Sequence, residues 1–205
     1  IYLLKRMNMH RFLTFLFLSI TAFGFTQTFL PPSTHYSQKD YGANQSPENF
    51  CITEDKAGVI YVGNVGAVLQ YDGFNWDTIK TANRQIVRSI HTSNKNEIYL
   101  GSINDFGILK QNKIGKLQYR SLRKLIKKEI EFQQVWNIHS SKNLVYFQTE
   151  KAIFIYNVNT NEIETIQAEE SFHTAYLSNE NYYVRQRKKG IQKLENGTLK
   201  TLKGS

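Results

Sequence analysis

The chain has 205 residues and a formal net charge of +9, which suits one domain with its own core or part of a larger repeat array. It has three prolines, 21% charged residues, and many Tyr, Phe, Ile, Val, Thr and Asn residues. This composition argues against disorder and favours pleated strands over helices. The single cysteine, Cys51, excludes an internal disulfide framework, and we expect it to be a small buried hydrophobic residue.

The amino terminus has the pattern of an export signal. An uncharged run at 12–25 ends near the small residues Ala22 and Gly24, at the spacing that a signal peptidase reads. Basic residues precede the run: Lys5, Arg6, His10 and Arg11. The run of about 14 residues is shorter than the roughly 20 that a helix needs to cross a bilayer, which favours cleavage over a permanent anchor.

We therefore predict a signal peptide at 1–24, a lead-in segment at 25–45 and a periplasmic location. Residues 1–6 precede Met7, the first plausible start, and need not be translated. Part of the positive charge belongs to this targeting segment. No other stretch is apolar and long enough to span a membrane.

An internal repeat occupies the rest of the chain, and one tyrosine keeps its place in each of four copies: Tyr61, Tyr99, Tyr146 and Tyr183. The spacings of 38, 47 and 37 residues bracket those of a four-stranded propeller blade. In each copy a short apolar strand precedes the tyrosine strand. A third strand, a turn rich in Asn, Asp or Gly, and an outer strand come after it. The repeat unit is therefore a four-stranded meander.

One meander cannot bury both of its faces, so it must stack on neighbours, either radially as a propeller or in a row as a solenoid. We predict an all-β fold, a β-propeller of four-stranded antiparallel blades. About four blades are present, at the low end of the usual four to eight, so the ring is expected to be incomplete. The predicted blades span 46–80, 85–119, 133–167 and 171–205.

The long middle spacing indicates an insertion at 120–132. Its apolar residues share one helical face, which predicts a short amphipathic helix between the second and third blades. These residues are Leu122, Leu125, Ile126 and Ile130.

Two clusters carry the excess of basic residues. The insertion holds one, and the other comprises Arg185, Arg187, Lys188, Lys189 and Lys193. They are interpreted either as a surface for a polyanion or anionic glycan, or as solvated loops, and the second interpretation is favoured. Export argues against nucleic acid as a partner.

A search for catalytic and metal-binding residues gives no site. His91 and His139 take equivalent places in the second and third repeats, where the first and fourth have Thr53 and Tyr176, so they are expected to be strand-end residues and not metal ligands. Asp55, Asp72, Asp77 and Asp105 lie in scattered turns. No nucleophile, phosphate-binding or metalloprotease motif occurs.

We therefore expect no enzyme, no catalytic or metal-binding residues and no cofactor. The residues that bind a ligand stay unassigned. Most aromatic residues of the repeats are expected to fill the space between blades, with a few at loop ends free to stack on a sugar or peptide. They are Tyr61, Tyr71, Trp76, Tyr99, Phe106, Trp136, Tyr146, Phe154 and Tyr183.

The first repeat carries a family resemblance. Its residues Asp55-Lys-Ala-Gly58-Val-Ile-Tyr61-Val-Gly63-Asn-Val-Gly66, followed by Tyr71-Asp-Gly73, resemble the two-component-regulator propeller repeat. The second repeat keeps Ile98-Tyr99-Leu100-Gly101. The segment Tyr36–Ser46 is similar to the start of flavobacterial members, which carry a propeller sensor followed by a triple-tyrosine domain.

The resemblance implies a periplasmic propeller, followed in full-length members by a triple-tyrosine domain, a transmembrane helix and a cytoplasmic output domain. We expect an amino-terminal fragment of such a regulator, a ligand-sensing module without its output domain. The implied partners are an unknown small-molecule or glycan ligand and the downstream domains, and a homodimer is left open. The alternative is a secreted propeller for glycan binding or adhesion, and a propeller hydrolase would need clustered carboxylates.

Overall fold

The computed structural model describes residues 11, 13–14, 31–128 and 130–205. Contacts divide the chain into two units, Ile1–His35 and Tyr36–Ser205, and the second contains all the strands described. The predicted signal peptide at 1–24 and the first part of the lead-in segment lie outside the described residues, apart from three positions. Among the helices that are described, none is long and apolar enough to cross a membrane.

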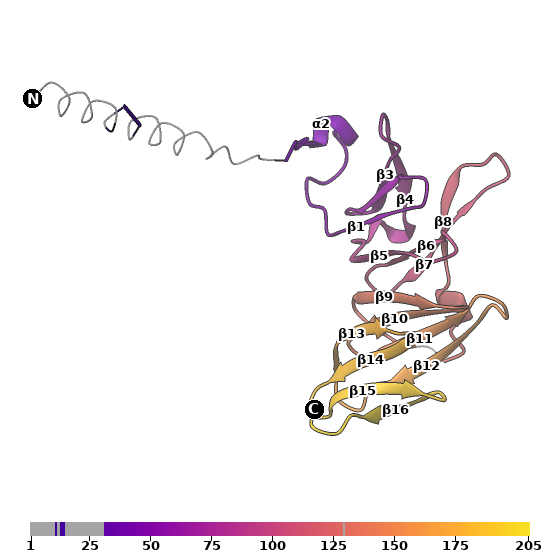
Figure 1. Ribbon diagram of the computed structural model, residues 1–205. Coiled ribbons are helices and arrows are strands. Elements are labelled where there is room, and N and C mark those ends of the chain that lie inside the picture. The colour runs from indigo at the N-terminus through magenta and orange to yellow at the C-terminus, as the bar shows by residue number, and fades with distance from the viewer. Residues whose placement is uncertain (1–10, 12, 15–30, 129) are drawn as a thin grey trace, which may run out of the picture. The chain divides into compact units, whose positions relative to one another are not determined.

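Four antiparallel sheets of four strands each make up the second unit, and every sheet is a meander in chain order (Figure 1). The first contains β1 (Cys51–Glu54), β2 (Ile60–Gly63), β3 (Ala67–Tyr71) and β4 (Trp76–Lys80). The second contains β5 (Ser89–Thr92), β6 (Ile98–Gly101), β7 (Phe106–Gln111) and β8 (Leu117–Ser121). The third contains β9 (Val135–Ser141), β10 (Leu144–Thr149), β11 (Ala152–Asn157) and β12 (Glu162–Gln167). The fourth contains β13 (Phe172–Ser178), β14 (Asn181–Gln186), β15 (Gly190–Glu195) and β16 (Thr198–Thr201).

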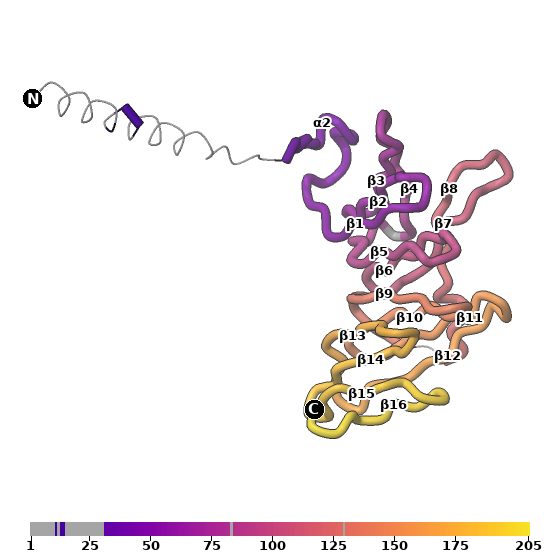
Figure 2. The backbone as a smooth tube through the Cα atoms, viewed as in Figure 1, coloured from indigo at the N-terminus to yellow at the C-terminus, as the bar shows by residue number. Residues whose placement is uncertain are grey.

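The sheets stack as propeller blades. Each blade's first strand contacts the first strand of the next blade, so that β1, β5, β9 and β13 lie one after another, as the tube in Figure 2 shows. The outer strands β4 and β8 also contact each other. In a propeller, the inner strands of successive blades lie side by side and the outer strands lie further from the axis. The contacts in this chain follow that arrangement. The predicted all-β fold of four-stranded blades is confirmed.

Apolar side chains fill the space between successive blades. The repeat tyrosine takes part in this core in the first three blades, since Tyr61, Tyr99 and Tyr146 are each buried in one of the clusters between blades. The hydroxyl of Tyr61 donates to the Asp55 carboxylate at 3.1 Å, and that of Tyr99 to the Glu97 carboxylate at 2.7 Å. These two buried rings therefore keep a partner for their polar atom, as a tyrosine in a core requires.

The segment before the first blade docks onto that blade. The short helix α2 (Gln38–Tyr41) brings Tyr41 against Trp76, with ring centroids 5.6 Å apart. The buried side chain of Asn64 donates to the carbonyl oxygens of Ser46 at 2.8 Å and Glu48 at 3.0 Å. These contacts anchor residues 36–49 to the first sheet and leave part of its apolar face uncovered.

The predicted amphipathic helix over 120–132 is wrong in extent. Residues 120 and 121 continue β8, and the helical part is a single 3-10 turn, η3 (Arg123–Leu125). The connection is held at both ends, because the Leu122 amide donates to the Phe106 carbonyl at 2.9 Å and Gln134 forms a β-bridge with Ile103. The segment runs from an outer strand back to an inner one, and these contacts fix its backbone in a non-helical path beyond the 3-10 turn. The four apolar residues of the predicted face still pack on the core: Leu122, Leu125, Ile126 and Ile130.

Candidate ligand-binding site

Each inner strand begins with two residues that face one residue of the neighbouring strand. In the third blade Gln148 pairs with Asn137 and Thr149 pairs with Val135, so that Trp136 is the extra residue of a β-bulge. In the fourth blade the pairing skips His173 in the same way. Bulges re-aim a side chain and are common beside binding sites.

The first two blades have the same arrangement one residue ahead of the strand. The amide of Phe50 donates to the carbonyl of Gly63, the residue that also pairs with Cys51. The amide of Arg88 likewise donates to the carbonyl of Gly101, which also pairs with Ser89. The four equivalent residues, one in each blade, are called the inner-strand row: Phe50, Arg88, Trp136 and His173.

Three members of the inner-strand row contact each other across the blades. The guanidinium carbon of Arg88 lies 5.5 Å from the centre of the Phe50 ring and 4.9 Å from that of the Trp136 ring, so the cation is held between two aromatic faces. Cation–π contacts of this kind contribute about 0.5–2 kcal/mol each. Trp136 nevertheless keeps 43% of its surface exposed, which is unusual for so large an apolar side chain.

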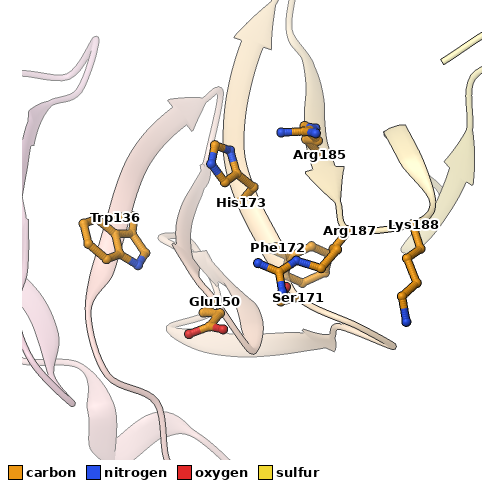
Figure 3. A pocket seen from close by; sticks show the side chains of 8 residues that line it. All are labelled: Trp136, Glu150, Ser171, Phe172, His173, Arg185, Arg187 and Lys188. Carbon is orange, nitrogen blue, oxygen red and sulfur yellow. The ribbon is translucent and has the colours of Figure 1, made fainter.

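The exposed part of Trp136 borders a pocket of about 450 Å³ at the third and fourth blades. We call it the row pocket. Figure 3 shows the Trp136 ring on one side of it and His173 and Arg187 on the other, with Glu150 below the two rings and Lys188 pointing away from the other side chains. Its lining consists of Trp136, Glu150, Ser171, Phe172, His173, Arg185, Arg187 and Lys188.

The row pocket is positively charged. Three cationic side chains line it, against the single carboxylate of Glu150. Lys188 already has a partner, the Glu170 carboxylate at 3.2 Å. Among the described residues, neither Arg185 nor Arg187 has a carboxylate within ion-pair distance. Two guanidinium groups in a concave site are therefore free to meet an anion.

The comparisons with known proteins concern the fold. No family model matches the chain, and no curated protein matches it. The extracellular domain of the putative one component system BT4673 from B. thetaiotaomicron is 16% identical with a TM-score of 0.56, over 78% of this chain and 22% of that one. Virginiamycin B lyase from Staphylococcus aureus is 11% identical with a TM-score of 0.61, over 79% and 58% of the two chains. The WD40 propeller domain of Doa1 is 14% identical with a TM-score of 0.53, over 74% and 53%.

This chain is built like β-propellers. It spans between 22% and 58% of the lengths of these three structures, whose sequences are too distant to carry more than the architecture. They include a regulator's extracellular domain and an enzyme, so the architecture alone does not decide between binding and catalysis.

The two equivalent histidines lie between blades, away from the row pocket. His91 Nε2 is 2.8 Å from the Ser140 hydroxyl, and His139 Nε2 is 3.0 Å from the Ala175 carbonyl oxygen. Burial, with the nearby His139, lowers the pKa of His91 to about 4, and burial also lowers the pKa of His139. Each ring thus joins its blade to the next. No group of three or more His, Cys, Asp or Glu that could hold a metal occurs among the residues searched, which are those described.

The scattered aspartates serve the chain locally. Asp55 and Asp72 accept backbone amides within their own turns, as at Ala57 and Phe74, both at 2.8 Å. Asp105 accepts the amide of Phe106 at 2.9 Å and the hydroxyl of Ser121 at 2.6 Å. Hydrogen bonds to Asn75 and Phe74 lower the pKa of Asp72. Cys51 is half-buried, and burial raises the pKa of its thiol to about 11, which makes it a poor nucleophile.

The two basic clusters end up in different surroundings. Of the second cluster, Arg185, Arg187 and Lys188 line the row pocket, whereas Lys189 pairs with Glu169 at 2.7 Å and Lys193 with Glu195 at 3.2 Å. In the insertion, Arg123 stacks on the Phe132 ring with its guanidinium carbon 5.5 Å from the ring centre, and Lys127 lies 3.7 Å from the Glu162 carboxylate.

Sequence reasoning missed three of the four residues in the inner-strand row. Trp136 was named only in the list of repeat aromatics, most of them expected in the core and a few expected to be free to stack on a ligand, and Phe50, Arg88 and His173 were not singled out. A signal for them exists. Each lies eleven residues before the repeat tyrosine in the first two repeats and ten before it in the last two, so stacking the repeats one strand further back would have aligned them.

Proposed function

We propose that this chain is an extracytoplasmic ligand-binding module of a membrane-bound sensor regulator, and that its ligand binds in the row pocket. The observation that carries this proposal is the inner-strand row. Four blades place a residue at one equivalent position, three of these residues are stacked together, and a half-exposed tryptophan borders a charged pocket. Exposed aromatic side chains that are rigidly held are typical of binding sites.

The lining of the pocket favours binding over catalysis. It offers an aromatic face, cations and one carboxylate, a set that recognises a ligand through stacking and ion pairs. Catalysis of glycoside hydrolysis would need a second carboxylate beside Glu150. The lining has only that one.

Binding is tested by calorimetry with the whole chain and a panel of neutral and acidic oligosaccharides and amino acids. A ligand that binds in the row pocket is expected to lose at least about fivefold in affinity in Trp136→Ala, because stacking on one aromatic ring contributes about 1–3 kcal/mol. The matched control is Phe74→Ala, which removes a side chain that is 92% exposed in the turn between β3 and β4. If every ligand of the panel binds Trp136→Ala as tightly as it binds the unaltered chain, the site is elsewhere.

Export is supported by the predicted signal at 1–24 and by the likeness to an extracellular domain. Alkaline phosphatase, which is active only outside the cytoplasm, is fused after Ser205 and assayed in whole cells. We expect activity that disappears when residues 9–24 are deleted. Activity that survives the deletion, or no activity with the signal intact, would contradict an extracytoplasmic location.

The sensor role and the alternative of a secreted glycan-binding or adhesion protein differ in the coding sequence beyond Ser205. The sensor role predicts that the reading frame continues past Ser205 into further blades, a triple-tyrosine domain and a transmembrane helix. A stop codon directly after Ser205 would favour the secreted protein. Sequencing the adjoining DNA decides between them.

A further inference from the structure

We infer that the ligand of the row pocket is a small organic acid, with its carboxylate between Arg185 and Arg187 and its ring against Trp136. This inference depends on the proposed function for the place of binding, and adds the chemical class of the ligand. Three observations carry it: two guanidinium groups without a carboxylate partner, an excess of positive charge in the lining, and an exposed indole held in place from behind.

The first observation concerns which basic side chains are free. Lys188 and Lys189, in the turn between β14 and β15, pair with Glu170 and Glu169. Arg185 and Arg187 are both exposed, both line the row pocket, and neither has an ion pair with the described residues. The planar guanidinium group offers paired donors that match the two oxygens of a carboxylate. Of the three basic side chains that line the pocket, the two arginines are therefore the ones left to bind a ligand anion.

The second observation concerns the balance of charge. Lys188 is compensated by Glu170, but Arg185 and Arg187 together face only the Glu150 carboxylate. A neutral ligand would therefore leave one cation of the pocket uncompensated. A ligand with one carboxylate compensates that charge, and Glu150 is then available to accept hydrogen bonds from ligand hydroxyl groups. The lining therefore suits an acid that also carries donors better than a simple inorganic anion.

The third observation concerns Trp136. The Arg88 guanidinium covers the indole from the side of the second blade at 4.9 Å, and Phe50 lies behind Arg88 at 5.5 Å. The indole is thus fixed before a ligand arrives, which lowers the entropy that binding would otherwise cost. An inorganic anion would gain nothing from this exposed ring, whereas a ligand ring would stack on it.

The experiment compares acids with neutral partners of the same shape, using the whole chain and calorimetry at low and at 0.5 M salt. One arm uses trigalacturonate and its methyl ester, and the other uses benzoate and benzamide, so that a sugar acid and an aromatic acid are distinguished. We expect one acid to bind at least tenfold more tightly than its neutral partner, with affinity falling as salt is raised. The double variant Arg185→Gln/Arg187→Gln is expected to lose at least tenfold for that acid.

The matched control is Lys113→Gln/Lys116→Gln, which removes two positive charges from the exposed turn between β7 and β8 and should leave affinity unchanged. A second variant, Arg185→Lys/Arg187→Lys, keeps the charge and loses the paired donors, so it should retain part of the affinity. Thermal unfolding of each variant establishes that the fold is intact.

The outcomes separate the two proposals. If a neutral partner binds as well as its acid, and binding depends on Trp136 but not on the arginines, the inference is overturned while the proposed function stands. If the control variant loses as much affinity as the arginine variant, the effect is one of net charge and the inference is likewise overturned. If neither acid binds, the inferred class of ligand is wrong. Calorimetry with the panel of oligosaccharides and amino acids then tests the proposed function by itself.

Discussion

At Gly101 the next blade packs directly against strand β6. A Cβ atom added there would lie 2.5 Å from the Cβ of Val135 and 2.7 Å from the hydroxyl oxygen of Ser89, far inside normal contact distances. Gly101→Ala is therefore expected to lower the free energy of unfolding by about 1–3 kcal/mol, because the blades must separate to admit the methyl group. Urea unfolding measures it, with Lys113→Ala as the exposed control. A loss under about 0.5 kcal/mol, the usual range for surface changes, would mean that the blades are not so tightly packed.

The two half-buried histidines are expected to make stability depend on pH. Burial lowers the pKa of His91 in the folded chain to about 4, whereas an unfolded histidine titrates near 6.5. The folded state therefore binds fewer protons between these values, so stability is complete above about pH 6.5 and falls as the pH drops toward 4. His139 acts in the same direction.

We expect His91 alone to lower the free energy of unfolding by about 2 kcal/mol between pH 7 and pH 5. Urea unfolding at the two pH values measures the loss, and His91→Gln should reduce the difference because glutamine does not titrate. A difference as large in His91→Gln as in the unaltered chain would assign the pH dependence to other groups.

Single residues also mark the limit of what the sequence predicts. Three of the four repeat tyrosines were correctly predicted to be core, because spacing and alternation depend only on the period of the repeat, whereas Tyr183 in the last blade is only half-buried. Arg88 and His173 were not identified, because their role arises from bulges, and a bulge changes the direction of one side chain without changing the period. The partners of the lysines could not be predicted either, since Lys189 and Glu169 meet only when a turn of the fourth blade lies against the connection from the third.

At the scale of whole elements, the connection between β8 and β9 shows why a pattern is not yet a structure. Apolar residues at helical spacing predicted a helix, and the same residues do pack inward, but along a chain that is pinned at Leu122 and Gln134. The periodicity of four apolar residues reports burial reliably. It does not report backbone conformation when other contacts fix the ends of a segment.

This connection is expected to contribute strongly to stability through Phe132. Its side chain is 4% exposed, and its ring centre lies 4.9 Å from that of Phe154 and 5.9 Å from that of Phe106. Phe132→Ala should cost about 3–5 kcal/mol, the usual loss for a buried phenylalanine. Phe74→Ala removes the same side chain from an exposed turn and should change stability by less than about 0.5 kcal/mol. Equal effects in urea unfolding would mean that the connection is not part of the core.

At the scale of the whole molecule, the two outermost blades have faces that internal blades bury. Ile52 in β1 is 68% exposed, whereas its equivalents Ile138 and Ala175 are 6% and 1% exposed. At the other end Tyr176 is 64% exposed, whereas the equivalent His139 contacts the following blade. Within the described residues, the first and fourth blades thus each have one face without the neighbouring blade that covers the same face elsewhere in the chain.

The whole-molecule prediction compares a charge at an open face with the same charge at a closed one. Ile138→Glu places a carboxylate between the second and third blades and is expected to unfold the chain or to cost several kcal/mol. Ile52→Glu places it at the equivalent point of the open face, where water solvates it, and should change stability by less than about 0.5 kcal/mol. Thermal unfolding at two protein concentrations, with sedimentation, measures both.

A large loss in Ile52→Glu would mean that the face is covered in solution, and sedimentation would then identify the cover. If the unaltered chain sediments with twice the mass of one chain and Ile52→Glu sediments as a monomer, a second copy of this chain covers the face. The unfolding temperature of the unaltered chain would then rise with concentration. A monomer that Ile52→Glu destabilises would instead mean that the segment with Tyr36 and Tyr41 closes over the face, since these rings already pack on the same blade against Trp76. Because Ile52 and Ile138 take the same place in the repeat, the difference between the two variants depends on the neighbour and not on the position within the blade.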